Sequence, residues 1–182
     1  MTVKEVLYQA ALLVGATDAA AFLDGSSTAG EKETNVLLRC LNFVENEVAL
    51  DYLPLCSEET FESETGVIPF EKLALAATRI VSVKDEAGNS VAFKSFPDYI
   101  KTQLGKVTVT YTYTPKEKAL GDEMEYSRLA SKRLFAYGVA AEYCLACGLY
   151  EEAAVWDKKY KEAIGAAYES HPPRRLASRR WA

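Results

Sequence analysis

The hydrophobic period of this 182-residue chain changes twice, which constrains the fold more than any other feature. From about residue 2 to 51, apolar residues recur every three or four positions, as on one face of a helix. Between residues 57 and 114 they alternate with a period of two, typical of strands. The helical period then returns from about residue 122 to 168. We therefore expect an α+β protein: a mainly helical body interrupted by a small antiparallel β insert.

Three helices are predicted before the β insert. The first covers about residues 2–14 and ends at Gly15, and the second covers 17–23. The third runs from about residue 31 to 51, and Pro54 prevents its continuation. Residues 1–56 thus form the N-terminal part of the helical core.

The clearest strand covers Lys106 to Thr114, where residue types alternate strictly. One face would carry two valines and two tyrosines and the other four threonines. Residues 79–83 and 90–93 flank a turn at residues 85–89 that suits a hairpin. We expect the acidic entry to this insert, residues 57–64, to be an exposed loop.

Two further helices are predicted after the insert, over about residues 122–149 and 150–168. Gly148 suits the break between them, and so short a connection favours a long antiparallel helical hairpin. Residues 115–168 would complete the helical core. Pro172 and Pro173 forbid further helix, so residues 169–182 are expected to leave as an extended basic arm.

Several kinds of chemistry lack the residues that they need. The single histidine, His171, lies in the proline- and arginine-rich tail, and no glycine-rich phosphate loop is present. Cys144 and Cys147 form a C-x-x-C pair without a second pair or a nearby histidine, so we expect reduced core thiols rather than zinc or redox chemistry. No apolar run approaches the roughly 20 residues of a membrane span. We expect a soluble protein without a cofactor and without these catalytic devices.

Charge is distributed unevenly along the chain. The total is −5, but the segment from His171 onward contains four arginines and no acid, so the first 170 residues carry −9. This basic tail could be a solvated terminus, a nucleic-acid-binding segment or a peptide that anchors the chain in a partner protein. We favour the anchor, because arginine and tryptophan are enriched at interface hot spots and prolines reduce the entropy lost on docking.

Residues 137–164 carry a family resemblance. Their sequence is YGVAAEYCLACGLYEEAAVWDKKYKEAI. A helix ending in Ala141-Glu142-Tyr143, a short turn and a second helix with the pattern A-x-x-W-x-x-K-Y-x-x-A resemble the head-to-tail connector (adaptor) proteins of tailed bacteriophages and prophages. The match is sharpest over residues 122–168.

The resemblance implies a structural protein of the virion neck that assembles in the host cytoplasm. Such adaptors form rings, usually of twelve subunits, beneath the portal protein. The ring extends the channel for double-stranded DNA and is the platform for a tail or stopper protein. Tyr137, Tyr143, Trp156 and Tyr160 would form the packed body. The portal-docking arm would consist of Arg174, Arg175, Leu176, Arg179, Arg180 and Trp181.

The acidic residues of the body fit a channel that lets DNA slide. An acidic wall avoids the counterion-release affinity of a basic one. We expect some of the acids in two groups to face the channel, although an ordinary solvated surface is the alternative. The candidates are Glu31, Glu33, Glu45, Glu47, Glu58, Glu59, Glu62 and Glu64.

Two other classes of protein compete with the connector. One is a nucleic-acid-binding module that uses the arginine-rich tail, and the other is an enzyme of unrecognised type. Ending the chain at Ser170 separates the first from the connector: a nucleic-acid module would lose DNA retention, whereas a connector would lose portal attachment. The sequence does not choose between tail docking and subunit contact for the β insert.

Overall fold

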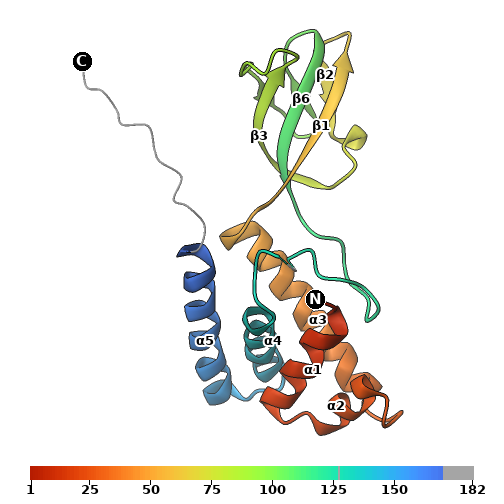
Figure 1. Ribbon diagram of the computed structural model, residues 1–182, viewed down its shortest axis with the longest axis vertical. Helices are drawn as coiled ribbons and strands as arrows, with labels where there is room; N and C mark the ends of the chain where they lie inside the picture. Colours follow the sequence, from red (N-terminus) through yellow and green to blue (C-terminus); the bar gives the residue numbers. More distant parts are fainter. Residues whose placement is uncertain (127, 170–182) are drawn as a thin grey trace, which may run out of the picture. The chain divides into compact units, whose positions relative to one another are not determined.

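The computed structural model describes residues 1–126 and 128–169 of the chain. They fall into two compact units, a helical unit of Met1–Glu45 with the described chain from Glu117 onward, and a β unit of Asn46–Lys116. The α+β class expected from the sequence is confirmed: the fold combines N-terminal helices, two small antiparallel three-stranded sheets and a C-terminal pair of helices in contact (Figure 1).

The helical unit begins with two short helices whose ends follow local sequence signals. Helix α1 covers Val3–Val14 and α2 covers Thr17–Asp24. Thr2 and Glu5 form a capping box at the start of α1, and Gly15 ends it in the left-handed conformation, with φ of 71°. Both helices were predicted within one residue of their observed bounds.

Three longer helices complete this unit. Helix α3 covers Glu31–Glu47 and continues into a π-helical turn, Val48–Tyr52; α4 covers Lys132–Ala146 and α5 covers Tyr150–Glu169. Helix α4 lies between α1 and α5 and packs against both (Figure 1). The predicted break at Gly148 is confirmed, because this residue has φ of 75° between α4 and α5.

The prediction of helix is wrong over residues 122–126 and 128–131. Ser131 caps α4, and its side chain accepts a hydrogen bond from the Leu134 backbone. Upstream, the chain pairs with the N-terminus: Val3 N–H donates to the Asp122 carbonyl at 3.0 Å, and Met124 N–H to the Met1 carbonyl at 3.1 Å. These bonds satisfy backbone groups that a helix would have used, and they bury the Met124 side chain.

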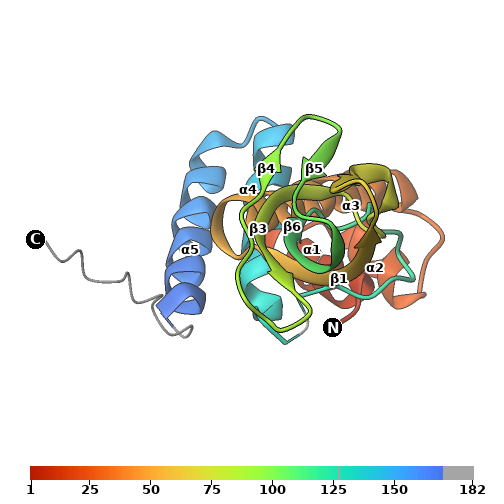
Figure 2. The ribbon, with the colours of Figure 1, turned by 90° about the horizontal axis from the view of Figure 1, so that it is seen from above.

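The β unit consists of six strands in two sheets, ordered β1-β6-β3 and β2-β5-β4. The strands of both sheets curve around one interior (Figure 2). That interior is filled by apolar side chains from both sheets, including Ile68, Ile100, Val107, Val109 and Tyr111. The strands are β1 (Leu55–Ser63), β2 (Val67–Pro69), β3 (Ala77–Asp85), β4 (Lys94–Ser95), β5 (Tyr99–Lys101) and β6 (Gly105–Tyr113).

Strand β6 confirms the prediction for residues 106–114, with both ends shifted by one residue. Its threonines lie on the outer face and are linked to neighbouring strands: Thr108 to Thr60 at 3.0 Å and Thr112 to Thr78 at 2.8 Å. Thr110 donates to a Glu58 carboxylate oxygen at 2.9 Å. The polar face of the central strand is therefore tied to both neighbours.

Two predictions in this unit are wrong. Residues 57–64 are not a loop, because most of them form β1, which pairs antiparallel with β6 along its whole length. Residues 90–93 are not a strand. The turn at Asp85–Asn89 does form, with Asp85 N–H donating to the Asn89 carbonyl at 2.9 Å, but an isolated bridge at Ser90 replaces a continuing ladder.

Candidate functional site

The aromatic residues that carry the family resemblance lie on α4 and α5. Tyr143 and Tyr160 are buried, whereas the rings of Tyr137 and Trp156 stack at 5.7 Å between centroids. Lys159 places its ammonium 4.4 Å from the Trp156 ring centroid, a cation–π contact. The stack of Tyr137 on Trp156 links α4 to α5.

Glu33, one of the expected channel acids, instead joins three helices. One carboxylate oxygen accepts the Ala19 backbone N–H at 3.1 Å, and the other accepts the Tyr143 hydroxyl at 2.7 Å. Helix α2 has no side-chain cap of its own, so Glu33 satisfies one of its unpaired N–H groups. Burial and the bond to Glu33 raise the pKa of Tyr143.

Glu45 is not a surface acid either, because it is only 1% exposed. Its Oε1 atom accepts the Glu125 backbone N–H at 3.3 Å. Burial raises the pKa of Glu45 to about 7, although Lys118 opposes the shift. Lys118 pairs with the Glu125 carboxylate at 3.1 Å, and its backbone exchanges two hydrogen bonds with the Asn42 amide. This cluster fixes the segment that precedes α4 onto α3.

The remaining acids divide by exposure. Glu59 is half-buried; it accepts the Ala74 N–H at 3.1 Å and the Tyr111 hydroxyl. Glu47 is half-buried in the last turn of α3. The exposed candidates for a channel surface are Glu31, Glu58, Glu62 and Glu64.

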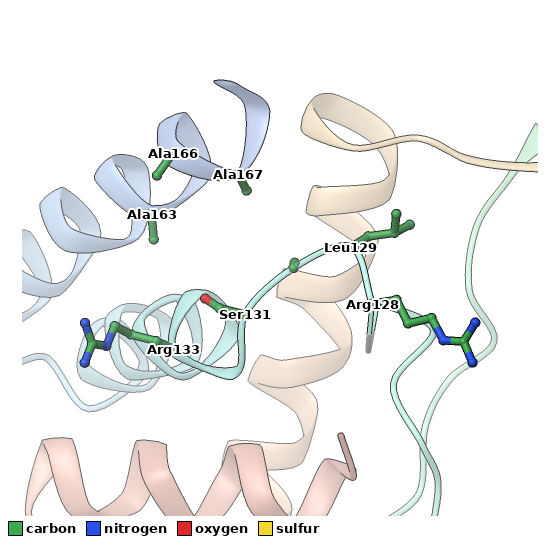
Figure 3. Close-up of a pocket in the computed structure, with 8 residues that line it drawn as sticks. Arg128, Leu129, Ser131, Arg133, Ala163, Ala166 and Ala167 are labelled. Atoms are coloured by element: carbon green, nitrogen blue, oxygen red, sulfur yellow. The ribbon is translucent and has the colours of Figure 1, made fainter. Parts of the chain in front are cut away.

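The predicted portal-docking residues, Arg174, Arg175, Leu176, Arg179, Arg180 and Trp181, lie outside the described residues. The structure does describe the end of α5 that precedes them. A shallow hollow of about 500 Å³ lies beside this end, between α5 and the start of α4. Ala163, Ala166 and Ala167 face Ser131 across it, whereas Arg128 and Arg133 extend away on opposite sides (Figure 3). It is therefore a surface of small side chains, not a pair of converging charges.

Only one of the two cysteines of the C-x-x-C pair is buried as expected. Cys144 is buried, but Cys147 is exposed because it caps α4 where the chain turns toward α5. Among the described residues, no group of three histidine, cysteine or acidic side chains could hold a metal ion.

One surface that sequence reasoning missed lies on the short β4–β5 hairpin. Lys94, Phe96, Tyr99 and Lys101 gather there, and we call these four residues the basic face. The signal in the sequence is K-S-F-P-D-Y-I-K, in which two lysines bracket two aromatics and a turn. It is weak, because it becomes a surface only when the hairpin forms.

Comparison with known proteins leaves the family open. No protein-family model matches the chain, and a search of curated proteins gives no match. None of the described helices is both long enough and apolar enough to cross a membrane.

Proposed function

We propose that this chain is a head-to-tail connector (adaptor) of a tailed bacteriophage or prophage, a structural protein rather than an enzyme. The observation that carries the proposal is the α4–α5 pair, in which Trp156 of the resembling pattern stacks on Tyr137 and Tyr160 packs against α4 at Gly138. In this proposal the pair is the antiparallel hairpin of the adaptor body. The ring, of twelve subunits as in similar adaptors, lies in the virion neck.

Because Glu169 is the last residue of α5 and not the start of the arm, the proposed portal contact is made by residues 170–182 as an extended basic arm. Their four arginines and Trp181 are types that contribute most at protein interfaces. The helix that precedes them, α5, is held to α4 by buried side chains, so it gives the arm a fixed origin. The opposite charge of body and arm favours contact of the arm with a partner protein over docking of the whole chain on DNA.

The channel surface belongs to the exposed acids in this proposal. Glu31, Glu58, Glu62 and Glu64 are exposed and can repel phosphates, whereas Glu33, Glu45 and Glu59 are buried or half-buried and accept backbone N–H groups within the chain. Double-stranded DNA would therefore pass without specific binding. A tail or stopper protein would attach to the ring.

Electron microscopy of the full chain mixed with its portal protein tests the proposal. We expect a ring beneath the portal with density for residues 171–182 on it. A chain ended at Ser170 should keep its far-UV circular dichroism spectrum and lose portal attachment. If the shortened chain still binds the portal but no longer retains DNA in a mobility-shift assay, the tail is a nucleic-acid-binding segment and the proposal is wrong.

A further inference from the structure

The basic face places two lysines directly opposite each other. In the β4–β5 pairing, Lys94 lies across from Lys101, and both side chains are exposed. Like charges at directly opposed positions destabilise a sheet. Among the described residues neither ammonium has an ion pair, so nothing within this part of the chain offsets the repulsion. An acidic group of another molecule would offset this repulsion.

The surroundings of the lysines suit a carboxylate. They border a hollow of about 480 Å³ whose wall includes Phe93, Phe96, Thr102 and Gln103. The Thr102 hydroxyl is buried and has no hydrogen-bond partner within the described chain. A buried hydroxyl without a partner is uncommon and costly. A carboxylate from another molecule would accept from the exposed lysines at the border of this hollow.

The chain itself supplies a complementary surface. Residues 53–71 contain five glutamates and no lysine or arginine. Within them, Glu58 and Glu62 are exposed on β1, which is an edge strand paired only with β6. The acidic edge and the basic face are different surfaces of one β unit. A contact between them is therefore heterologous, and repetition of such a contact generates a ring when the rotation closes.

We propose that the basic face of one copy binds the acidic edge of β1, at Glu58 and Glu62, in a second copy. This inference rests on the proposed ring and identifies the subunit contact within it. It would leave Glu31 and Glu64 as the exposed channel acids. A second copy is a better occupant than nucleic acid, because the net charge of −9 on the first 170 residues repels phosphates while the same chain offers carboxylates.

Charge reversal on the portal-bound ring tests the contact. K94E/K101E and E58K/E62K should each raise the protein concentration needed for half-maximal ring formation by at least about a hundredfold, because like charges would meet. The two variants mixed in equal amounts, or all four changes in one chain, should restore assembly. K72E/K84E changes the same charge at exposed lysines elsewhere in the β unit and should assemble like the wild type.

Carbodiimide cross-linking of the unaltered chain gives a second measurement that needs no portal. In a mixture of ¹⁵N-labelled and unlabelled copies, we expect Lys94 or Lys101 joined to Glu58 or Glu62 between copies. Rings of K94E/K101E at the wild-type concentration, or no restoration by the fourfold variant, would overturn the contact but not the connector. Intermolecular cross-links without a portal ring would support the contact and overturn the connector. DNA retention lost in K94E/K101E with its ring intact would assign the face to nucleic acid.

Discussion

At Gly138, α4 lies close to its neighbours in the helical unit. A β-carbon added there would lie 2.7 Å from Val44 Cγ1 on α3 and 3.0 Å from Tyr160 Cε2 on α5. Tyr160 is buried and a valine has little rotamer freedom, so neither side chain can easily yield. Glycine is therefore required at this position by packing, although it weakens a helix.

Two opposing terms set the effect of G138A. Alanine improves helix propensity by about 1 kcal/mol, whereas overpacking a core costs typically about 1–3 kcal/mol. Because the added β-carbon would meet two atoms at 3.0 Å or less, we expect a cost of about 2–3 kcal/mol, so that the free energy of unfolding falls by about 1–2 kcal/mol. Gly165 on α5 is the matched control: it is exposed, and an added β-carbon would meet nothing within 4 Å. G165A should raise stability by about 0.5–1 kcal/mol.

Urea unfolding followed by far-UV circular dichroism measures both variants. With a slope of about 2 kcal/mol per molar urea, G138A should lower the midpoint by about 0.5–1 M while G165A raises it. In a V44A background the penalty of G138A should shrink by about 1 kcal/mol, because the clashing methyl group is gone. A G138A variant as stable as G165A would refute the packing argument.

Three substitutions test the hydrogen-bonded acids and amide of the helical unit. The pKa of Glu45 is raised to about 7 in the folded chain, above its ordinary 4.5, so the folded state holds the proton more tightly and stability falls as pH rises between these values. In E45Q the free energy of unfolding, measured by urea unfolding at several pH values, should no longer show this fall of about 3 kcal/mol. N42A removes two hydrogen bonds to the Lys118 backbone and should cost about 1–3 kcal/mol in the same assay. Y143F should cost about 1–2 kcal/mol at pH 7, because Glu33 loses its hydroxyl donor.

Exposed residues of the same types provide the controls. E162Q and N35A alter exposed side chains on α5 and α3, and Y150F alters a tyrosine that is 71% exposed. Each should change stability by less than about 0.5 kcal/mol. Equal losses at Asn42 and Asn35 would mean that the hydrogen bonds to Lys118 do not determine the loss, because alanine has the higher helix propensity at both positions. A pH profile of E45Q that still falls like that of the wild type would remove Glu45 as its cause.

The parts of the fold that sequence predicted well are those whose signals are local. Helix α1 is determined by a four-residue capping box and by Gly15, and β6 by its own alternation. The α4–α5 turn follows from Gly148, which adopts a conformation that glycine favours. In each case the residues that decide the structure lie within or beside the element.

The parts predicted wrongly depend on partners far along the chain. In the sequence alone, β1 has the composition of an acidic loop. It is stabilised as a strand by a partner far along the chain, where Thr110, 52 residues away, donates to Glu58. Residues 122–124 have a helical pattern, yet their backbone pairs with residues 1–3. A pattern confined to ten residues contains no information about such pairings. The basic face was missed for the same reason, because the β4–β5 register brings Lys94 and Lys101 together.

The sequence identified eight glutamates as candidate channel acids but could not predict which of them are exposed. In the sequence alone, all eight carry the same charge and cannot be told apart. A carboxylate can be buried only where hydrogen-bond donors contact it. Glu33, Glu45 and Glu59 each accept a backbone N–H from a distant segment, at Ala19, Glu125 and Ala74. These three carboxylates therefore stabilise the two units and add little to the field that a passing phosphate meets. Repulsion of DNA by the proposed ring depends on the exposed acids, and if neighbouring copies cover β1, it depends on fewer still.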